Sequence, residues 1–313
     1  MGADRNSNKG GTRYLKLERL IRQHPKKILF LFLLLIAYYF CLPGQLFNTP
    51  NATVVESRSG KLLGALIAED GQWRFPAVDS VPHKFETCIL NFEDAHFYYH
   101  PGFNPVSIAK AFAANIVAGK AVRGGSTLTQ QVIRLSRNHQ KRSYWEKIKE
   151  LVLATRLEFR SSKKDILKLY SSHAPFGGNV VGLEVAAWRY FGTEPTQLSW
   201  AEAATLAVLP NAPSLIYPGK NQIKLLNKRN NLLQKHHIDS TTYQLSLLEE
   251  LPKKPFPLPD TAHHLVQYLS KKGKGKRILT HLDEKLQVNV NAIVQKHYNT
   301  LKQNQVYNAA ILV

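Results

Sequence analysis

The chain has 313 residues, of which 44% are hydrophobic and 20% are charged, as in an ordinary globular protein with one or two domains. The two cysteines exclude a disulfide framework. The sequence also lacks the GxxxxGK[ST] pattern of phosphate-binding P-loops.

Positive charge dominates the sequence, with 42 Lys and Arg residues against 22 Asp and Glu residues and a net charge of +20. Net charge informs on association rather than on fold. An excess of this size favours a polyanionic partner, such as nucleic acid, an anionic membrane surface or a phosphorylated substrate. From charge alone, a basic surface without a specific partner is an equally good interpretation.

The N-terminal part of the sequence predicts a membrane anchor. Residues 1–27 form a basic tail, and residues 28–42 read ILFLFLLLIAYYFCL without a charge. A membrane span needs about 20 residues, so the predicted transmembrane signal anchor extends over residues 28–47. The positive-inside rule places the basic tail in the cytoplasm and the rest of the chain outside. A cleaved signal peptide or a buried core helix are the alternatives, but no A-x-A-like cleavage site follows.

This topology describes a single-pass protein of the cytoplasmic (inner) membrane, with the bulk of the chain on the outer, periplasmic side. It disfavours nucleic acid as a partner. An anionic lipid surface or a lipid-linked phosphate then fits the basic charge.

Beyond the anchor, the sequence predicts a mainly α fold. Residues 48–85 carry strand-like pieces and predict a small β stalk, and residues 86–250 have a helical pattern. Asn104 before Pro105 predicts a helix start, as does the capping box from Ser199 to Glu202. Residues 251–313 begin with the Pro-rich segment LPKKPFPLP, which predicts a linker, and continue with a helix of about 20 residues.

The stretch NFEDAHFYYHPG places the acids Glu93 and Asp94 among aromatic residues. In a helix, Glu93 and Phe97 would lie one turn apart. Aromatic neighbours would remove water from the Glu93 carboxyl and raise its pKa towards the range of a general base. An exposed acid at a helix end is the alternative. His96 and His100 have the spacing of zinc ligands but lack the Glu of H-E-x-x-H, so no metal site is predicted there.

The stretch RGGSTLTQQVIR, residues 123–134, leads two glycines into a helix predicted to start near Ser126. Free N–H groups at a helix start, together with hydroxyls and cations, suit a phosphate. An ordinary Gly-Gly turn with a Ser or Thr cap is the alternative. The candidate phosphate-binding residues are Arg123, Ser126, Thr127, Thr129 and Arg134.

The stretch WEKIKEL places Lys147 and Glu150 on one helix face, three residues apart. This second acid could contact substrate or support the first site. A plain surface ion pair is the more common meaning of such a spacing.

Together, these segments resemble one family, the peptidoglycan glycosyltransferases (glycosyltransferase family 51). EDAHFYYHPG resembles the family's E-D-x-x-F-x-x-H-x-G motif, GGSTLTQQ its second motif, and Lys147 and Glu150 fall on its R-K-x-x-E motif. KKDILKLY and LSWAEAATLAVLPNAPS resemble the fourth and fifth motifs, and APFGG resembles the 1C type of class A penicillin-binding proteins. ILTHLDEKLQ resembles the start of a transpeptidase domain, so we expect residues 251–313 to hold the linker and the beginning of that domain, whose remainder is missing.

The resemblance implies a lysozyme-like glycosyltransferase domain that docks on the membrane and polymerises lipid II into glycan strands, with inversion and release of undecaprenyl pyrophosphate. It implies that Glu93 is the base and that Glu150 is a second catalytic acid that orients substrate or Lys147, or helps to hold a divalent cation (Mg or Mn). No other cofactor is expected. The partners implied are lipid II, the growing glycan chain, the membrane and other cell-wall synthesis proteins. The substrate-binding residues implied are Phe97, His100, Arg123, Ser126, Thr127, Thr129, Gln131, Arg134 and Lys147.

Two positions depart from the family pattern. Glu146 stands where the family usually has Arg, and Ser171-Ser172 follows Tyr170 where the family usually has Leu-Asn. These departures keep a non-catalytic, membrane-anchored scaffold open as an alternative. A lysozyme-like glycoside hydrolase is the third interpretation, because two carboxylates also cleave sugar polymers.

Overall fold

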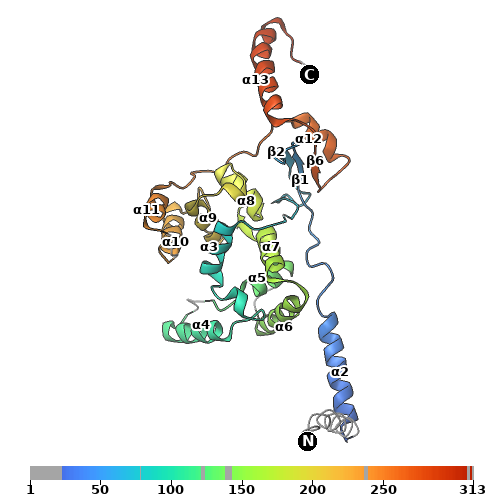
Figure 1. Ribbon diagram of the computed structural model, residues 1–313, viewed down its shortest axis with the longest axis vertical. Coiled ribbons are helices and arrows are strands. Elements are labelled where there is room, and N and C mark those ends of the chain that lie inside the picture. The colour runs from blue at the N-terminus through green and yellow to red at the C-terminus, as the bar shows by residue number, and fades with distance from the viewer. Residues whose placement is uncertain are drawn as a thin grey trace, which may run out of the picture. The chain divides into compact units, whose positions relative to one another are not determined.

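The computed structural model describes residues 23–77, 79–120, 124–137, 143–235, 239–308 and 311. The chain divides into two units, Met1–Leu46 and Phe47–Val313, and each is described by itself. Figure 1 shows the elements of both units.

The first unit contains helix α2, Pro25–Phe40, with the sequence PKKILFLFLLLIAYYF. The helix has 16 residues and stops at Cys41, shortly before Pro43, which disfavours helical backbone at the residue before it. The prediction of one transmembrane helix over residues 28–47 is therefore not supported. In the part of the chain that the structure describes, every helix falls short of the length and hydropathy needed to cross a membrane.

The second unit is mainly helical, which confirms the predicted fold class at this level. Helix α3 packs on α9, α9 packs on α10, and α5 packs on both α6 and α7 (Figure 1). The helices of this body are α3 (His83–Glu93), α4 (Pro105–Ala118), α5 (Leu128–Ser136), α6 (Tyr144–Arg160), α7 (Lys163–His173), α8 (Leu183–Phe191), α9 (Trp200–Val208), α10 (Gln222–Lys235) and α11 (Ser240–Leu248), with 3-10 turns η1 (Phe97–Tyr99) and η2 (Pro195–Gln197).

Two predicted helix starts are confirmed. The Asn104 side chain accepts a hydrogen bond from the Ser107 N–H and caps α4, which has Pro105 in its first turn. Ser199 and Glu202 form the predicted capping box of α9. The cap residue thus satisfies N–H groups that have no partner within the helix.

Two small sheets accompany the helices. Strand β1 (Thr53–Glu56) pairs antiparallel with β2 (Leu62–Leu66), and β6 (Arg277–Leu279) pairs parallel with the other edge of β1. Apolar residues of this sheet pack against α12 (His263–Ser270). The second sheet has the order β3-β5-β4, from β3 (Trp73–Arg74), β4 (Pro175–Gly177) and β5 (Val180–Val181).

The segment after α11 thus returns to the strands that precede α3. Arg277 of β6 forms ion pairs with Glu56 of β1 and, at 2.6 Å, with Glu184 of α8. The segment that follows the predicted linker is therefore joined to the predicted β stalk, because β6 pairs with β1. Beyond β6, α13 (Glu284–Leu301) starts at the N-cap Asp283, as the helical pattern predicts, and η3 (Lys302–Asn304) follows.

Candidate active site

The end of α3 places the first candidate acid. Glu93 is the last residue of α3, and Asp94 leaves the helix with φ −158°. Phe97 lies in the separate turn η1. The expectation that Glu93 and Phe97 lie one helical turn apart is therefore wrong, because the helix ends between them.

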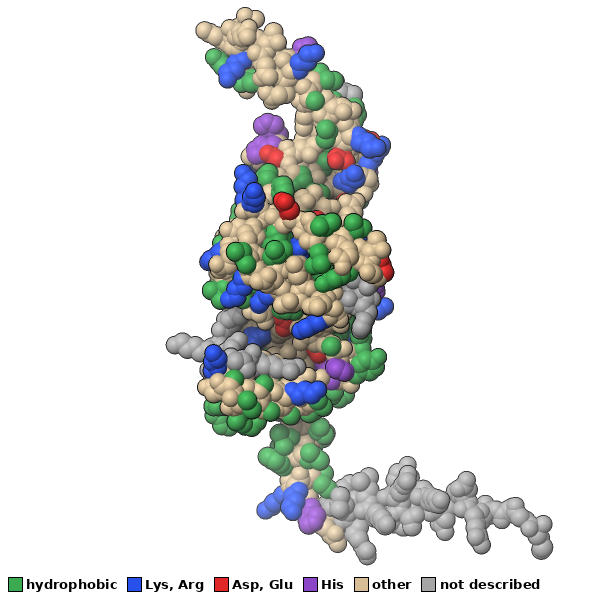
Figure 2. Space-filling view, turned by 90° about the vertical axis from the view of Figure 1, so that its left-hand side faces the viewer, with side chains coloured by type: hydrophobic (Ala, Val, Ile, Leu, Met, Phe, Trp, Pro, Cys, Tyr) green, Lys and Arg blue, Asp and Glu red, His purple; other side chains and the backbone are tan. Residues whose placement is uncertain are grey.

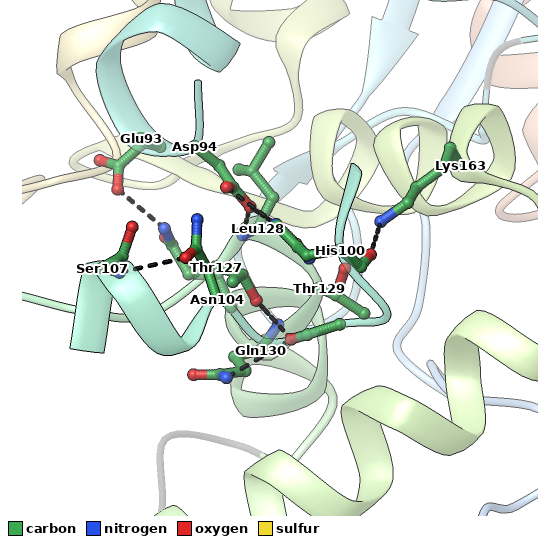
Figure 3. Close-up of polar contacts among 12 residues, drawn as sticks. Glu93, Asp94, His100, Asn104, Ser107, Thr127, Leu128, Thr129, Gln130 and Lys163 are labelled. Atoms are coloured by element: carbon green, nitrogen blue, oxygen red, sulfur yellow. Dashed lines mark hydrogen bonds and ion pairs between the residues drawn. The ribbon is translucent and has the colours of Figure 1, made fainter. Parts of the chain in front are cut away.

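Asp94 connects the end of α3 to the start of α5. Its Oδ2 accepts a hydrogen bond from the Leu128 N–H (3.0 Å), and its two carboxylate oxygens lie 2.9 and 3.0 Å from His100 Nε2 (Figure 3). The Asp94 and His100 side chains are only 5% and 6% exposed. These buried bonds hold the loop after Glu93 against α5, so they also position Glu93 beside that helix.

Thr127 binds the far end of the same loop, at Gly102. It is the N-cap of α5, one residue after the predicted start at Ser126, and it accepts from the Gln130 N–H. Its hydroxyl donates to the Gly102 carbonyl at 2.7 Å. Gly102 has φ +89°, a conformation that side-chain-bearing residues rarely adopt.

We expect Gly102→Ala to lower the free energy of unfolding by about 3 kcal/mol, because it combines backbone strain with a clash. A Cβ at this position would lie 2.8 Å from the Ala154 carbonyl oxygen, which belongs to the backbone of α6. Gly119→Ala is the matched control, since Gly119 also has positive φ but no atom within 4 Å of the added Cβ. Urea unfolding of both variants measures the difference, and equal losses would contradict this packing argument.

The Glu93 carboxyl is held by two amides. Gln131 Nε2 donates to Oε2 at 2.8 Å, and Asn211 Nδ2 makes a longer contact of 3.5 Å with Oε1. Burial raises the pKa of Glu93, while the two amides and the charges of Arg134 and Lys228 act against this rise. A carboxyl that is partly desolvated yet able to ionise has the properties of a general base.

Lys147 joins the second acid to the start of α5. Its Nζ donates to Ser126 Oγ (2.8 Å), Gln130 Oε1 (2.6 Å) and Glu150 Oε2 (3.2 Å). Lys147 and Glu150 share a face of α6, as predicted, and Glu150 is buried. The cation is thus oriented by three oxygens, which a plain surface ion pair does not provide.

Glu146, which departs from the family pattern, is paired. Arg137 Nη2 donates to its two carboxylate oxygens at 2.6 and 2.8 Å. The negative charge that replaces the family's usual Arg is therefore compensated by a neighbouring guanidinium.

A groove of about 1900 Å³ brings most of the candidate residues together. Its walls include Glu93, His100, Ser126, Thr127, Gln131, Arg134, Lys147 and Glu150. Two candidates lie outside these walls: Phe97 is buried with Lys163 Nζ 4.4 Å from its ring centroid, and Thr129 donates to Glu158 at 2.5 Å. Arg123 lies outside the described residues. Phe97 and Thr129 are therefore buried residues that do not line the groove.

Two residues near Glu93 were not predicted from the sequence. Asn211 lies in the segment that resembles the fifth family motif, where no role was predicted for it. Lys228 lies on α10, in a segment without a recognised pattern. Their proximity to Glu93 depends on how α9 and α10 pack against α3.

The described residues do not gather the ligands that a divalent cation needs. Among the described residues, no three His, Cys, Asp or Glu side chains gather closely enough to hold a metal ion. The Glu150 carboxylate is bound by Lys147 instead. We therefore derive no chemical step through a metal.

Comparison with known proteins identifies the family. The family model described as Transglycosylase matches residues 59–237, more than half of the chain. The chain belongs to the transglycosylase family. The family resemblance inferred from the motifs is thus confirmed, and every candidate site residue lies within the transglycosylase match.

Individual relatives are penicillin-binding proteins. Penicillin-binding protein 1C of Escherichia coli (strain K12) is 35% identical over 258 residues, which are 81% of this chain and 33% of the relative. Penicillin-binding protein 1A of Aquifex aeolicus (strain VF5) is 35% identical over 210 residues, which are 66% of this chain and 28% of the relative. This transglycosylase chain thus spans about a third of the length of these relatives.

A crystal structure of penicillin-binding protein 1A from Haemophilus influenzae matches 76% of this chain and 28% of its own, with 18% identity and a TM-score of 0.35. The family assignment rests on the transglycosylase match and the sequence relatives.

Proposed function

We propose that the chain is a peptidoglycan glycosyltransferase that polymerises lipid II into glycan strands and releases undecaprenyl pyrophosphate. The observation that carries this proposal is the groove of a transglycosylase domain in which a partly buried carboxyl, Glu93, shares the walls with the cations Arg134 and Lys147. A base and a set of cations are what glycosyl transfer from a pyrophosphate donor requires. A hydrolase that attacks a neutral sugar polymer has no need of the cations.

Glu93 acts as the base in this proposal. Its carboxylate takes the proton of the acceptor sugar 4-hydroxyl while that oxygen forms a bond to the anomeric carbon of the donor. The bond from that carbon to the pyrophosphate oxygen breaks on the opposite face, which inverts the configuration. The amides of Gln131 and Asn211 hold the carboxylate oxygens during the transfer.

The cations act on the leaving group. Pyrophosphate gains negative charge as the bond breaks, and Arg134 and Lys147 stabilise that charge. Lys147 is oriented for this task by Ser126, Gln130 and Glu150, so Glu150 contributes by positioning the cation. The Glu146 carboxylate in this part of the groove is compensated by Arg137.

A membrane location is part of the proposal. Helices α4 and α6 expose large apolar side chains, and Figure 2 shows hydrophobic side chains gathered at the end of the second unit that carries α4. Exposed patches of this kind are typical of membrane or protein contacts. The set comprises Val106, Phe112, Ile116, Val117, Tyr144, Trp145, Ile148 and Val152.

We propose that these residues dock a lysozyme-like domain on the outer leaflet of the cytoplasmic membrane. The apolar segment 28–47 would anchor the chain there, with its N-terminus inside. Other cell-wall synthesis proteins would meet the domain at the same membrane.

Labelled lipid II in detergent tests the proposed function. We expect the purified chain to convert it into polymer that is resolved on a gel, and to leave preformed glycan polymer intact. Shortening of the preformed polymer would instead indicate a glycoside hydrolase. A folded chain that changes neither substrate would indicate a scaffold, and either result would refute the proposal.

A further inference from the structure

Helix α10 approaches the catalytic carboxyl through one amide. Lys228 Nζ donates to Asn211 Oδ1 at 2.8 Å, and Asn211 Nδ2 faces Glu93 Oε1 at 3.5 Å. The three residues come from α10, from the turn after α9 and from the end of α3. They form a chain of contacts from a cation to the proposed base.

The chemistry of the three groups gives this chain one direction. A protonated lysine only donates hydrogen bonds, an ionised carboxylate only accepts them, and an amide has one accepting and one donating end. Lys228 therefore holds the oxygen of Asn211 and turns its NH₂ towards Glu93. Without this lysine, the amide could rotate and present its oxygen to the carboxylate, which is repulsive.

Lys228 is placed where its charge reaches Glu93. It is half-buried, and its Nζ lies 5.9 Å from the centroid of the Phe92 ring, next to Glu93. Burial lowers the pKa of Lys228, the charge of Lys224 lowers it further, and the charge of Glu93 acts in the opposite direction. The lysine and the carboxyl thus each favour the ionised form of the other.

The other titratable groups around Glu93 come from different elements. Arg134 of α5 acts on it as a second cation, and Tyr170 of α7 is a buried phenol whose pKa is raised mainly by burial and also by the Glu93 charge. Lys147 and Glu150 of α6 line the same groove but bind each other. Asp94, adjacent in the chain, binds His100 and the start of α5. Among the described residues, Lys228 is a cation that reaches Glu93 through a hydrogen-bonded amide.

We propose that Lys228 is a positioning residue for the Glu93 base: acting through Asn211, it orients the carboxylate and keeps it ionised for removal of the acceptor proton. This inference rests on the proposed function, since it assigns a role within the same site. The inference goes beyond the proposed function because it includes α10, whose sequence carries no motif of the family resemblance.

The titration of Glu93 tests the inference directly. In Lys228→Met, we expect the pKa of Glu93, followed by ¹³C NMR of the labelled carboxyl, to rise by about 0.5–1 unit. The sign follows because a nearby cation favours the charged carboxylate, so its removal favours the protonated form. The acid limb of the kcat/KM profile should move to higher pH by the same amount, which is about a three- to tenfold loss of rate on that limb.

Two variants separate charge from packing. Lys228→Arg keeps the cation and should restore the parent profile. Lys235→Met removes the same charge from the far end of α10, where Lys235 is exposed, and should leave the profile unchanged. If Lys228→Met does not fold, Asn211→Ala removes the connecting amide from an exposed position and should also raise the pKa of Glu93.

The outcomes distinguish this inference from the proposed function. An unchanged Glu93 titration in folded Lys228→Met, or in Asn211→Ala where the lysine variant does not fold, would overturn the role of Lys228 even if the parent polymerises lipid II. If the Glu93 titration shifts in Lys228→Met but the parent chain makes no polymer, the role of Lys228 stands and the proposed glycosyltransferase activity is refuted.

Discussion

Replacing Glu93 by Gln is expected to lower the turnover rate with lipid II by about 10²–10⁴-fold, the range that a general base contributes. The substitution preserves the size of the side chain and its ability to accept a hydrogen bond from Gln131, which lies 2.8 Å away. It removes the ability to take a proton, together with the negative charge and the second accepting oxygen, which faces Asn211. Initial rates of polymer formation at saturating lipid II measure this loss, and binding of lipid II should change little.

Glu86→Gln provides the matched control. Glu86 lies on the same helix, two turns earlier, where it accepts a hydrogen bond from the Tyr98 hydroxyl. The same chemical change at this position should leave the rate near that of the parent. A similar loss in both variants would indicate a general effect on α3, and an unchanged rate in Glu93→Gln would rule out Glu93 as the base.

The second large effect concerns stability. We expect Asp94→Ala to lower the free energy of unfolding by about 3–5 kcal/mol, because it leaves two buried hydrogen-bonding groups without their partner. The Leu128 N–H and His100 Nε2 would both lose their acceptor in a site that water hardly reaches. Chemical denaturation followed by circular dichroism measures the change.

Two further variants calibrate this result. Asp94→Asn keeps one acceptor oxygen of the same shape and should cost less than Asp94→Ala. Asp260→Ala removes an exposed carboxylate and should change stability by less than about 0.5 kcal/mol. If Asp94→Ala were no more destabilising than Asp260→Ala, Asp94 would not connect α3 to α5 as described.

Local sequence patterns predicted much of the helical framework. The caps at Asn104 and Ser199 mark helix starts because their side chains bond N–H groups within the next turn. The spacing of Lys147 and Glu150 predicted a shared face for the same local reason. Such signals require only neighbouring residues, so they can be read without a structure.

Other features depend on contacts between distant segments. α3 ends at Glu93 where Asp94 bonds to the start of α5, and no pattern within α3 indicates this end. Strand β6 pairs with β1, although almost the whole sequence of the second unit separates the two strands. Lys228 reaches Glu93 only because α10 and α9 pack together, and the apolar run of α2 does not itself show that the helix stops at Phe40.

The balance between lipid II consumed and undecaprenyl pyrophosphate released tests the central claim most directly. For the purified parent chain, the account predicts one carrier pyrophosphate released for each disaccharide unit added to polymer. Carrier release accompanied by free, unpolymerised sugar, or no release by a folded chain, would contradict glycosyl transfer in this groove.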